Sequence, residues 1–355
     1  MNVFDYVDYY KDYTFSERTF NEVDNIVFSL LSYVDFYGIV KESKEKITIK
    51  DAYDKFIKKY VPRKKEFIAI KNGVKLFEKI KDTKRYKDIK MMNYTYVGTD
   101  VAQFSAITFC INDNLFYVAF EGTDSLVSGW KEDCKMAYHF PVEAQVLAKK
   151  YLDKNFLLKN CSLIVGGHSK GGNLALVSSM FCNYFVKRKI IKIYSNDGQG
   201  LRKAQIESKF YEKIQDRFIH IIPNYSIVGL LLRHRNDYIV VKSSKMGILS
   251  HDLATWQVSY DHLEKSKLSR SSKVFEDGFQ KWLDKYDDEK RKIFVKEFFK
   301  LMENNDIKDL VEINIKKDLI LNIVKQSKEL NPIVKEMTFD LFKVIGKTNF
   351  DYPLF

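Results

Sequence analysis

Hydrophobic positions recur with helical spacing near the N-terminus of the chain. Between Phe20 and Val34 they fall every three or four residues, which is the spacing of one buried helix face. Asn21 precedes this run and Asp24 follows three residues later, as expected of an N-cap and of an acid near the positive end of the helix dipole. We predict a helix there that packs on the core, followed by charged helices and loops over 41–95 that form a lid or a side layer.

The middle of the chain alternates short apolar runs with helical patterns. The apolar runs that predict strands are 106–111, 115–120, 162–165, 190–194, 217–222 and 238–241. A polar turn, Asn112-Asp113-Asn114, joins the first two, and helical patterns at 142–152, 173–180 and 205–214 separate later ones. This alternation predicts an α/β fold with a mostly parallel sheet and helices on both faces.

The pattern becomes helical again from Ser269 onward, where aromatic and aliphatic residues recur among charges. Three or four amphipathic helices are expected to the end of the chain. We therefore predict a domain over 1–265, whose first 95 or so residues are a helical N-terminal segment, and a C-terminal helical extension over 266–355.

One strand prediction leads directly into a sequence that indicates chemistry. After the run that ends at Val165, the chain reads Gly-Gly-His-Ser-Lys-Gly-Gly-Asn over 166–173. This is the G-x-S-x-G pattern of a nucleophile elbow, in which Ser169 sits on a sharp strand-to-helix turn that leaves room for little but glycine beside it. A structural glycine-rich turn is the alternative interpretation.

A serine nucleophile needs a base, and in α/β hydrolases that base is a histidine that follows the serine and the acid in the chain. His251 fits because it follows the last predicted strand in a polar loop, whereas His168 belongs to the elbow and His220 lies inside a strand pattern. A surface or structural role for His251 is the alternative.

The acid is harder to place. The loop after the strand at 217–222 is the usual position, but it carries no carboxylate, and the preceding strand ends in Asn196-Asp197-Gly198. We favour Asp197 as the acid, against the alternative that it is an ordinary Asp-Gly turn residue. Asp237 and Asp252 are further candidates for the acid, and a serine–histidine dyad without an acid is another alternative.

An oxyanion hole requires two donors. The backbone N–H of Lys170, the residue after the nucleophile, is the first candidate. The second comes from the loop after the strand at 115–120, where the backbone of Thr123, or its hydroxyl, is suitably placed; an ordinary strand-to-helix turn is the alternative.

Several segments together resemble a bacterial lipase-like family of the α/β-hydrolase superfamily, described largely as a domain of unknown function and similar to class 3 lipases. The segments that carry the resemblance are 20–25, 120–124, 129–133, 167–173, 196–198, 251–252 and 255–257. The resemblance covers about residues 1–260 and implies an α/β-hydrolase fold with a serine-esterase site at Ser169 and His251. Class 3 lipases carry their acid in an Asp-Ile-Val-Pro-like segment, where this chain has Ser-Ile-Val-Gly over 226–229.

Composition narrows the setting. No run of about 18 apolar residues and no signal-like N-terminus is present, and the four cysteines form no CxxC pair, so we expect a cytoplasmic protein with reduced thiols. No two cysteines or histidines fall at metal-ligand spacing, and we expect no metal or cofactor. The net charge of +12 is scattered and indicates a solvated basic face or contact with an anionic membrane surface.

The sequence thus predicts a serine hydrolase that cleaves carboxylic esters, with a small-molecule or lipid ester as substrate. The first alternative is a catalytically weak hydrolase-fold protein that binds an acyl ligand, a partner or an anionic surface. A nucleic-acid or membrane-surface binder is the second, and since no nucleic-acid motif is present, we expect no nucleic-acid partner.

Overall fold

An eight-stranded sheet in the sequential order β1 to β8 forms the centre of the computed structural model, which describes residues 1–62, 66–99, 102–123, 127–235, 238–304 and 331–347. The first part of the sheet is antiparallel. It comprises β1 (Ile47–Thr48), β2 (Lys90–Gly98), β3 (Gln103–Cys110) and β4 (Leu115–Phe120), with consecutive strands of this set paired antiparallel. The parallel part comprises β4, β5 (Ser162–His168), β6 (Ile190–Asn196), β7 (Phe218–Pro223) and β8 (Ile239–Val241). The carboxyl ends of β4 to β8 therefore share one edge of the sheet.

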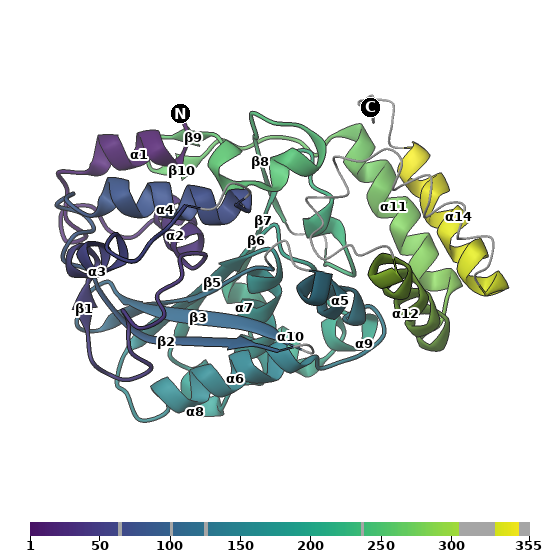
Figure 1. Cartoon of the computed structure of the whole chain (residues 1–355), viewed down its shortest axis with the longest axis horizontal. Helices are drawn as coiled ribbons and strands as arrows, with labels where there is room; N and C mark the ends of the chain where they lie inside the picture. The colour runs from purple at the N-terminus through teal and green to yellow at the C-terminus, as the bar shows by residue number, and fades with distance from the viewer. Residues whose placement is uncertain (63–65, 100–101, 124–126, 236–237, 305–330, 348–355) are drawn as a thin grey trace.

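Helices cover both faces of the sheet (Figure 1). On one face lie α1 (Val3–Tyr10), α2 (Glu22–Leu31), α3 (Ile49–Phe56) and α4 (Ile68–Ile80), close to the small hairpin of β9 (Val258–Ser259) and β10 (His262–Leu263). On the other lie α6 (Glu143–Phe156), α7 (Lys170–Phe181), α8 (Tyr184–Lys187), α9 (Lys203–Ile206) and α10 (Lys209–Glu212). Alternate residues of β4 enter the two cores, since Tyr117 packs with the first group and Phe116 with the second. The predicted mostly parallel α/β fold is confirmed.

The remaining helices lie at one end of the molecule (Figure 1). They are α5 (Val127–Lys135), α11 (Arg270–Lys285), α12 (Asp288–Asn304) and α14 (Pro332–Lys347). Short 3-10 turns complete the chain: η1 (Gln215–Arg217), η2 (Val228–Leu230), η3 (Gly247–His251) and η4 (Leu253–Thr255). The predicted C-terminal helices are therefore present, and α12 contacts α5 through a small apolar cluster centred on Val295 and Phe299.

Of the predictions for the N-terminal part of the chain, the helix after Asn21 is confirmed, and the wholly helical and loop structure expected over 41–95 is wrong. Asn21 caps α2 and Asp24 closes the capping box, as the sequence indicates. The segment 41–95 is not wholly helical, because β1 and β2 lie within it. β2 begins at Lys90, carries the polar Asn93 and Thr95 in its middle and has a register shift between Met92 and Thr95, which obscure its strand periodicity.

The N-terminal helices are tied to the sheet by buried polar contacts. Asp24 is fully buried and pairs with the buried Arg85 at 2.6 Å, and the hydroxyls of Tyr6 and Tyr86 donate to the same carboxylate. A buried charge of this kind requires such partners. One residue further along α2, Asn25 donates to the side chain of Asn196 at the end of β6, which brings α2 to the carboxyl edge of the sheet.

Candidate active site

Ser169 occupies a sharp turn between β5 and α7. Its φ of 56° and ψ of −129° lie in a region that L-residues rarely adopt, and its side chain is almost buried. A Cβ at Gly167 would lie 2.4 Å from the carbonyl carbon of Gly171, and one at Gly171 would lie 2.1 Å from the carbonyl oxygen of Phe120. The two glycines are therefore required by close backbone approach, as the elbow interpretation expects.

His251 and Asp197 meet at the same edge of the sheet. Asp197 follows β6 and His251 ends η3, and Nδ1 of His251 lies 2.6 Å from Oδ2 of Asp197. The Asp197 side chain is fully buried, whereas the His251 side chain is 17% exposed. A proton on Nδ1 donates to the carboxylate, which leaves Nε2 of the neutral ring free to accept a proton.

The loop after β7, which has no acid of its own, holds the acid of the neighbouring strand. Oδ1 of Asp197 accepts hydrogen bonds from the Ser226 hydroxyl at 2.5 Å and from the Gly229 backbone N–H at 3.0 Å. A Cβ at Gly229 would lie 2.2 Å from that oxygen. The Ser-Ile-Val-Gly segment thus supplies donors to Asp197, a role that the sequence reasoning did not find.

His168, the histidine that precedes Ser169, is hydrogen-bonded to the backbone of His251. Its Nε2 donates to the backbone carbonyl of His251 at 2.8 Å, so its Nδ1 accepts from the Tyr33 hydroxyl at 2.7 Å. The two imidazole rings are 4.3 Å apart between centroids. Burial, together with the charge of His251, holds the pKa of His168 well below its usual value, so this ring stays neutral.

The two candidate oxyanion donors are connected by a buried charge network. The side chain of Lys170, which begins α7, is buried and lies 2.5 Å from Oε2 of Glu132 in α5. In the same helix Asp133 accepts a hydrogen bond from the Thr123 hydroxyl at 2.6 Å. The hydroxyl of Thr123 is therefore engaged, and its backbone N–H is the group left for an oxyanion.

The other sequence candidates lie apart from this arrangement. Asp252 accepts from the Asn72 amide and from the Ala254 backbone, and Asp237 lies outside the described residues. His220 is buried in β7, where its ring stacks on that of His234, as the strand pattern predicts. Within the described ranges the Ser169 hydroxyl and Nε2 of His251 make no hydrogen bond to each other or to another residue; such catalytic contacts are often formed only when substrate binds.

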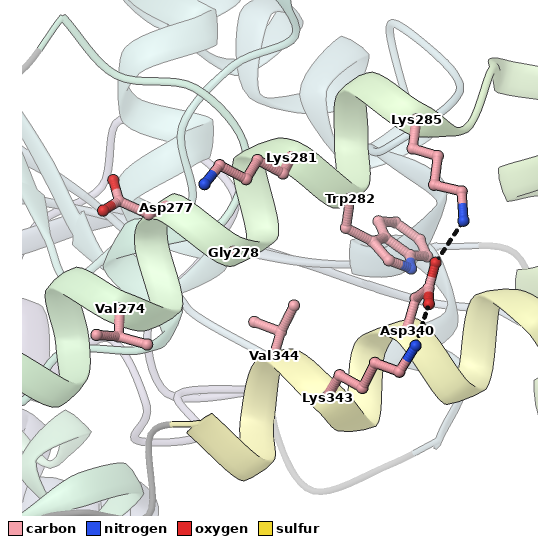
Figure 2. Close-up of a pocket in the computed structure, with 9 residues that line it drawn as sticks. All are labelled: Val274, Asp277, Gly278, Lys281, Trp282, Lys285, Asp340, Lys343 and Val344. Carbon is pink, nitrogen blue, oxygen red and sulfur yellow. Dashed lines mark hydrogen bonds and ion pairs between the residues drawn. The ribbon is translucent and has the colours of Figure 1, made fainter.

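A cavity of about 380 Å³ lies between α11 and α14, away from these residues. Figure 2 shows Trp282 and Val344 between the two helices and Lys285 and Lys343 directed toward Asp340. Asp340 pairs with both lysines, at 2.7 and 3.5 Å, and Asp277 and Lys281 also line the cavity. In the part of the chain that the structure describes, no cluster of three His, Cys, Asp or Glu side chains is suited to a metal ion.

The mostly parallel sheet, the helices on both of its faces and the sharp turn at Ser169 define an α/β protein with a strand–turn–helix serine. A family model described as Mbeg1-like matches residues 80–300, and the chain belongs to this Mbeg1-like family. No curated protein matches the sequence.

Solved lipase structures resemble the chain distantly. A fungal lipase–inhibitor complex has 13% identity and a TM-score of 0.36 over 62% of this chain and 76% of its own. M37 lipase has 16% identity and a TM-score of 0.35, over 59% and 69%. The Rhizomucor miehei lipase propeptide complex has 12% identity and a TM-score of 0.36, over 51% and 71%. Residue roles in this chain therefore rest on its own geometry.

Proposed function

We propose that the chain is a serine hydrolase that cleaves carboxylic esters, with lipid or acyl esters as the substrate class. The Ser169 hydroxyl attacks the ester carbonyl while Nε2 of His251 takes its proton. The backbone N–H groups of Thr123 and Lys170 hold the oxyanion, and Asp197 orients His251 and stabilises its protonated form. His251 then protonates the leaving alcohol, and water releases the acyl group from Ser169 through the same base.

The observation that carries this proposal is the buried Asp197–His251 pair beside the turn of Ser169. Asp197 has three hydrogen-bond donors and no exposure, which favours a fixed carboxylate over a turn residue facing solvent. The pair selects the tautomer of His251 whose Nε2 is a base.

An apolar surface beside His251 supports an acyl substrate. Just before the histidine, Met246, Ile248 and Leu249 are 46%, 52% and 64% exposed. Neighbouring exposed apolar side chains of this kind often mark a binding surface, and here they adjoin the proposed base.

The test is labelling with a fluorophosphonate, which reacts with activated serines. We expect the wild type to be labelled and to hydrolyse p-nitrophenyl esters, and Ser169→Ala to do neither. Ser178→Ala, which alters a buried serine of α7 outside the site, is the matched control and should keep both properties. A folded wild type that is neither labelled nor active would favour the catalytically weak binding protein instead.

One further expectation stays a prediction. The cytoplasmic location rests on the sequence alone. Among the helices that the structure describes, none is long and apolar enough to cross a membrane.

A further inference from the structure

Three short segments that are separated along the sequence together carry half of the net charge of the chain. Segments 157–161, 183–192 and 209–217 contain eight lysines and arginines but only two acids, Glu212 and Asp216, whereas the whole chain has a net charge of +12. We call these three segments the basic edge. A local excess of this size attracts an anionic partner.

The basic edge is a single surface because of the sheet topology. Its segments directly precede or enter β5, β6 and β7, and the amino ends of parallel strands share one edge. Contacts join the segments: Lys189 donates to the carbonyl of Leu157, and Arg217 donates to the carbonyl of Lys187. In Figure 1 α8, which belongs to this surface, lies on the other side of the sheet from α1 and α4.

The cations of the basic edge are not neutralised by acids. None of the eight forms an ion pair with a described residue: Lys159, Lys187, Arg188, Lys189, Lys192, Lys209, Lys213 and Arg217. Where they are hydrogen-bonded, the partners are uncharged backbone carbonyls, as for Lys187 with Met180 at 2.6 Å and Arg217 with Ile190 at 2.8 Å. The positive charge of this edge therefore remains available to a ligand.

Large apolar side chains project from the same edge. Leu158 is 96% exposed, Tyr184 65%, Phe185 61% and Phe210 48%. The Arg188 guanidinium lies 5.8 Å from the ring centre of Tyr184. Exposed aromatic and aliphatic groups surrounded by cations are the chemistry of a surface that enters the headgroup region of an anionic bilayer.

We propose that the basic edge docks on an anionic lipid bilayer. Its cations contact the lipid headgroups, and Leu158, Tyr184 and Phe185 enter the boundary between headgroups and acyl chains. Leu158, which is almost fully exposed and aliphatic, gains little from a nucleic acid, whose contacts are phosphate charge and base stacking, so the bilayer fits this surface better.

Docking in this way directs Ser169 away from the bilayer. Ser169 follows the carboxyl end of β5 and the basic edge lies at its amino end, one seven-residue strand away, which is a distance of about 20 Å. Substrate then reaches the site from the aqueous side. The docking does not depend on the proposed ester hydrolysis, and its test needs no catalysis.

The experiment is co-sedimentation of the full chain with vesicles of phosphatidylcholine alone or mixed with phosphatidylglycerol. We expect binding to the mixed vesicles only, and weakening as salt rises. The combined variant Arg188→Glu, Lys192→Glu and Lys213→Glu should bind at least tenfold more weakly. Its matched control reverses three exposed lysines elsewhere, Lys245, Lys265 and Lys267, and should bind within about threefold of the wild type.

A second pair of variants identifies the face that enters the lipid. Leu158→Ser with Phe185→Ser should lose most binding, and Met246→Ser with Leu249→Ser, beside His251, should retain it. The proposal is overturned if the second pair loses binding and the first does not, because the active-site edge would then be the one that docks. It is overturned equally by binding to duplex DNA with no binding to the mixed vesicles.

Discussion

Asp197 is the residue on which the orientation of the proposed base depends. Its carboxylate is buried and receives hydrogen bonds from Ser226, Gly229 and His251. Asp197 also adopts a φ of 48°, a conformation that Asp and Asn tolerate better than most residues. The side chain is thus fixed by backbone and donors together.

Asp197→Asn should lower kcat by about 10³- to 10⁴-fold with little change in KM, because the amide favours the wrong tautomer of His251. Steady-state hydrolysis of a p-nitrophenyl ester measures this. Asp252→Asn is the matched control, since Asp252 neighbours His251 in sequence but bonds to Asn72, and it should keep activity within about threefold. The assignment of the acid is wrong if the two variants exchange these effects.

Residue by residue, the sequence could indicate the reacting groups but not what supports them. Ser169, His251 and Asp197 were each found from a motif, chain order or a strand end, and the structure brings His251 and Asp197 into contact. Ser226, Gly229 and Tyr33 were missed because their roles are tertiary contacts that no local pattern contains. One signal was present: Ser226 and Gly229 lie in the segment that the sequence resemblance matches to the Asp-Ile-Val-Pro-like segment of class 3 lipases.

At the level of elements, α5 and α7 are joined by the buried Lys170–Glu132 pair. Glu132 also accepts from the Ala144 backbone at the start of α6, so three helices meet at this carboxylate. Since Lys170 supplies a proposed oxyanion donor and α5 holds Thr123 through Asp133, the same network would fix both sides of the proposed oxyanion hole.

Removing one partner of this pair leaves an unpaired buried charge. Lys170→Met and Glu132→Gln should each lower the free energy of unfolding by about 3–5 kcal/mol, whereas the double variant should lose less than the sum. Urea unfolding of the four proteins measures the coupling energy. Strict additivity would show that the two side chains do not act as a pair.

Elements with strong periodicity were predictable, and those with mixed patterns were not. α2 has a capping box and an uninterrupted apolar face, whereas the strand pattern of β2 is obscured by Asn93 and Thr95 in its middle and by its register shift. The single helix predicted over 205–214 is divided into α9 and α10, because Ser208 leaves the helical conformation to cap the second.

For the whole molecule, two buried histidines make stability depend on pH. Burial holds the pKa values of His168 and His220 well below the usual value of 6.5. As pH falls, these histidines take up protons in the unfolded chain before they do so in the folded chain. The free energy of unfolding is therefore unaffected by these histidines above about pH 6.5 and decreases below it.

The free energy of unfolding should fall by about 1.4 kcal/mol per pH unit for each of these histidines between pH 6 and 5. Urea titrations at several pH values measure the slope. His220→Asn should make it shallower, while His262→Gln, at an exposed position, should leave it unchanged. A slope unaffected by His220→Asn would contradict the assignment.

The architecture of the whole chain was predictable because alternation of strands and helices restricts the sheet to few topologies. The division into 1–265 and a C-terminal extension stays a prediction. α11 shares an apolar cluster with Ile222 of β7 and Leu230 of η2. We therefore propose that the extension packs against the sheet and is not a separate domain.

The acyl-enzyme on Ser169 is the central claim, and rapid quenching tests it most directly. The chain is mixed with excess p-nitrophenyl butyrate, p-nitrophenolate is recorded over the first turnover, and the quenched protein is digested for mass spectrometry. We predict a burst of one p-nitrophenolate per chain and one butyryl group on the peptide that contains Ser169. Hydrolysis with the acyl group on another residue, or undiminished in Ser169→Ala, would contradict the account.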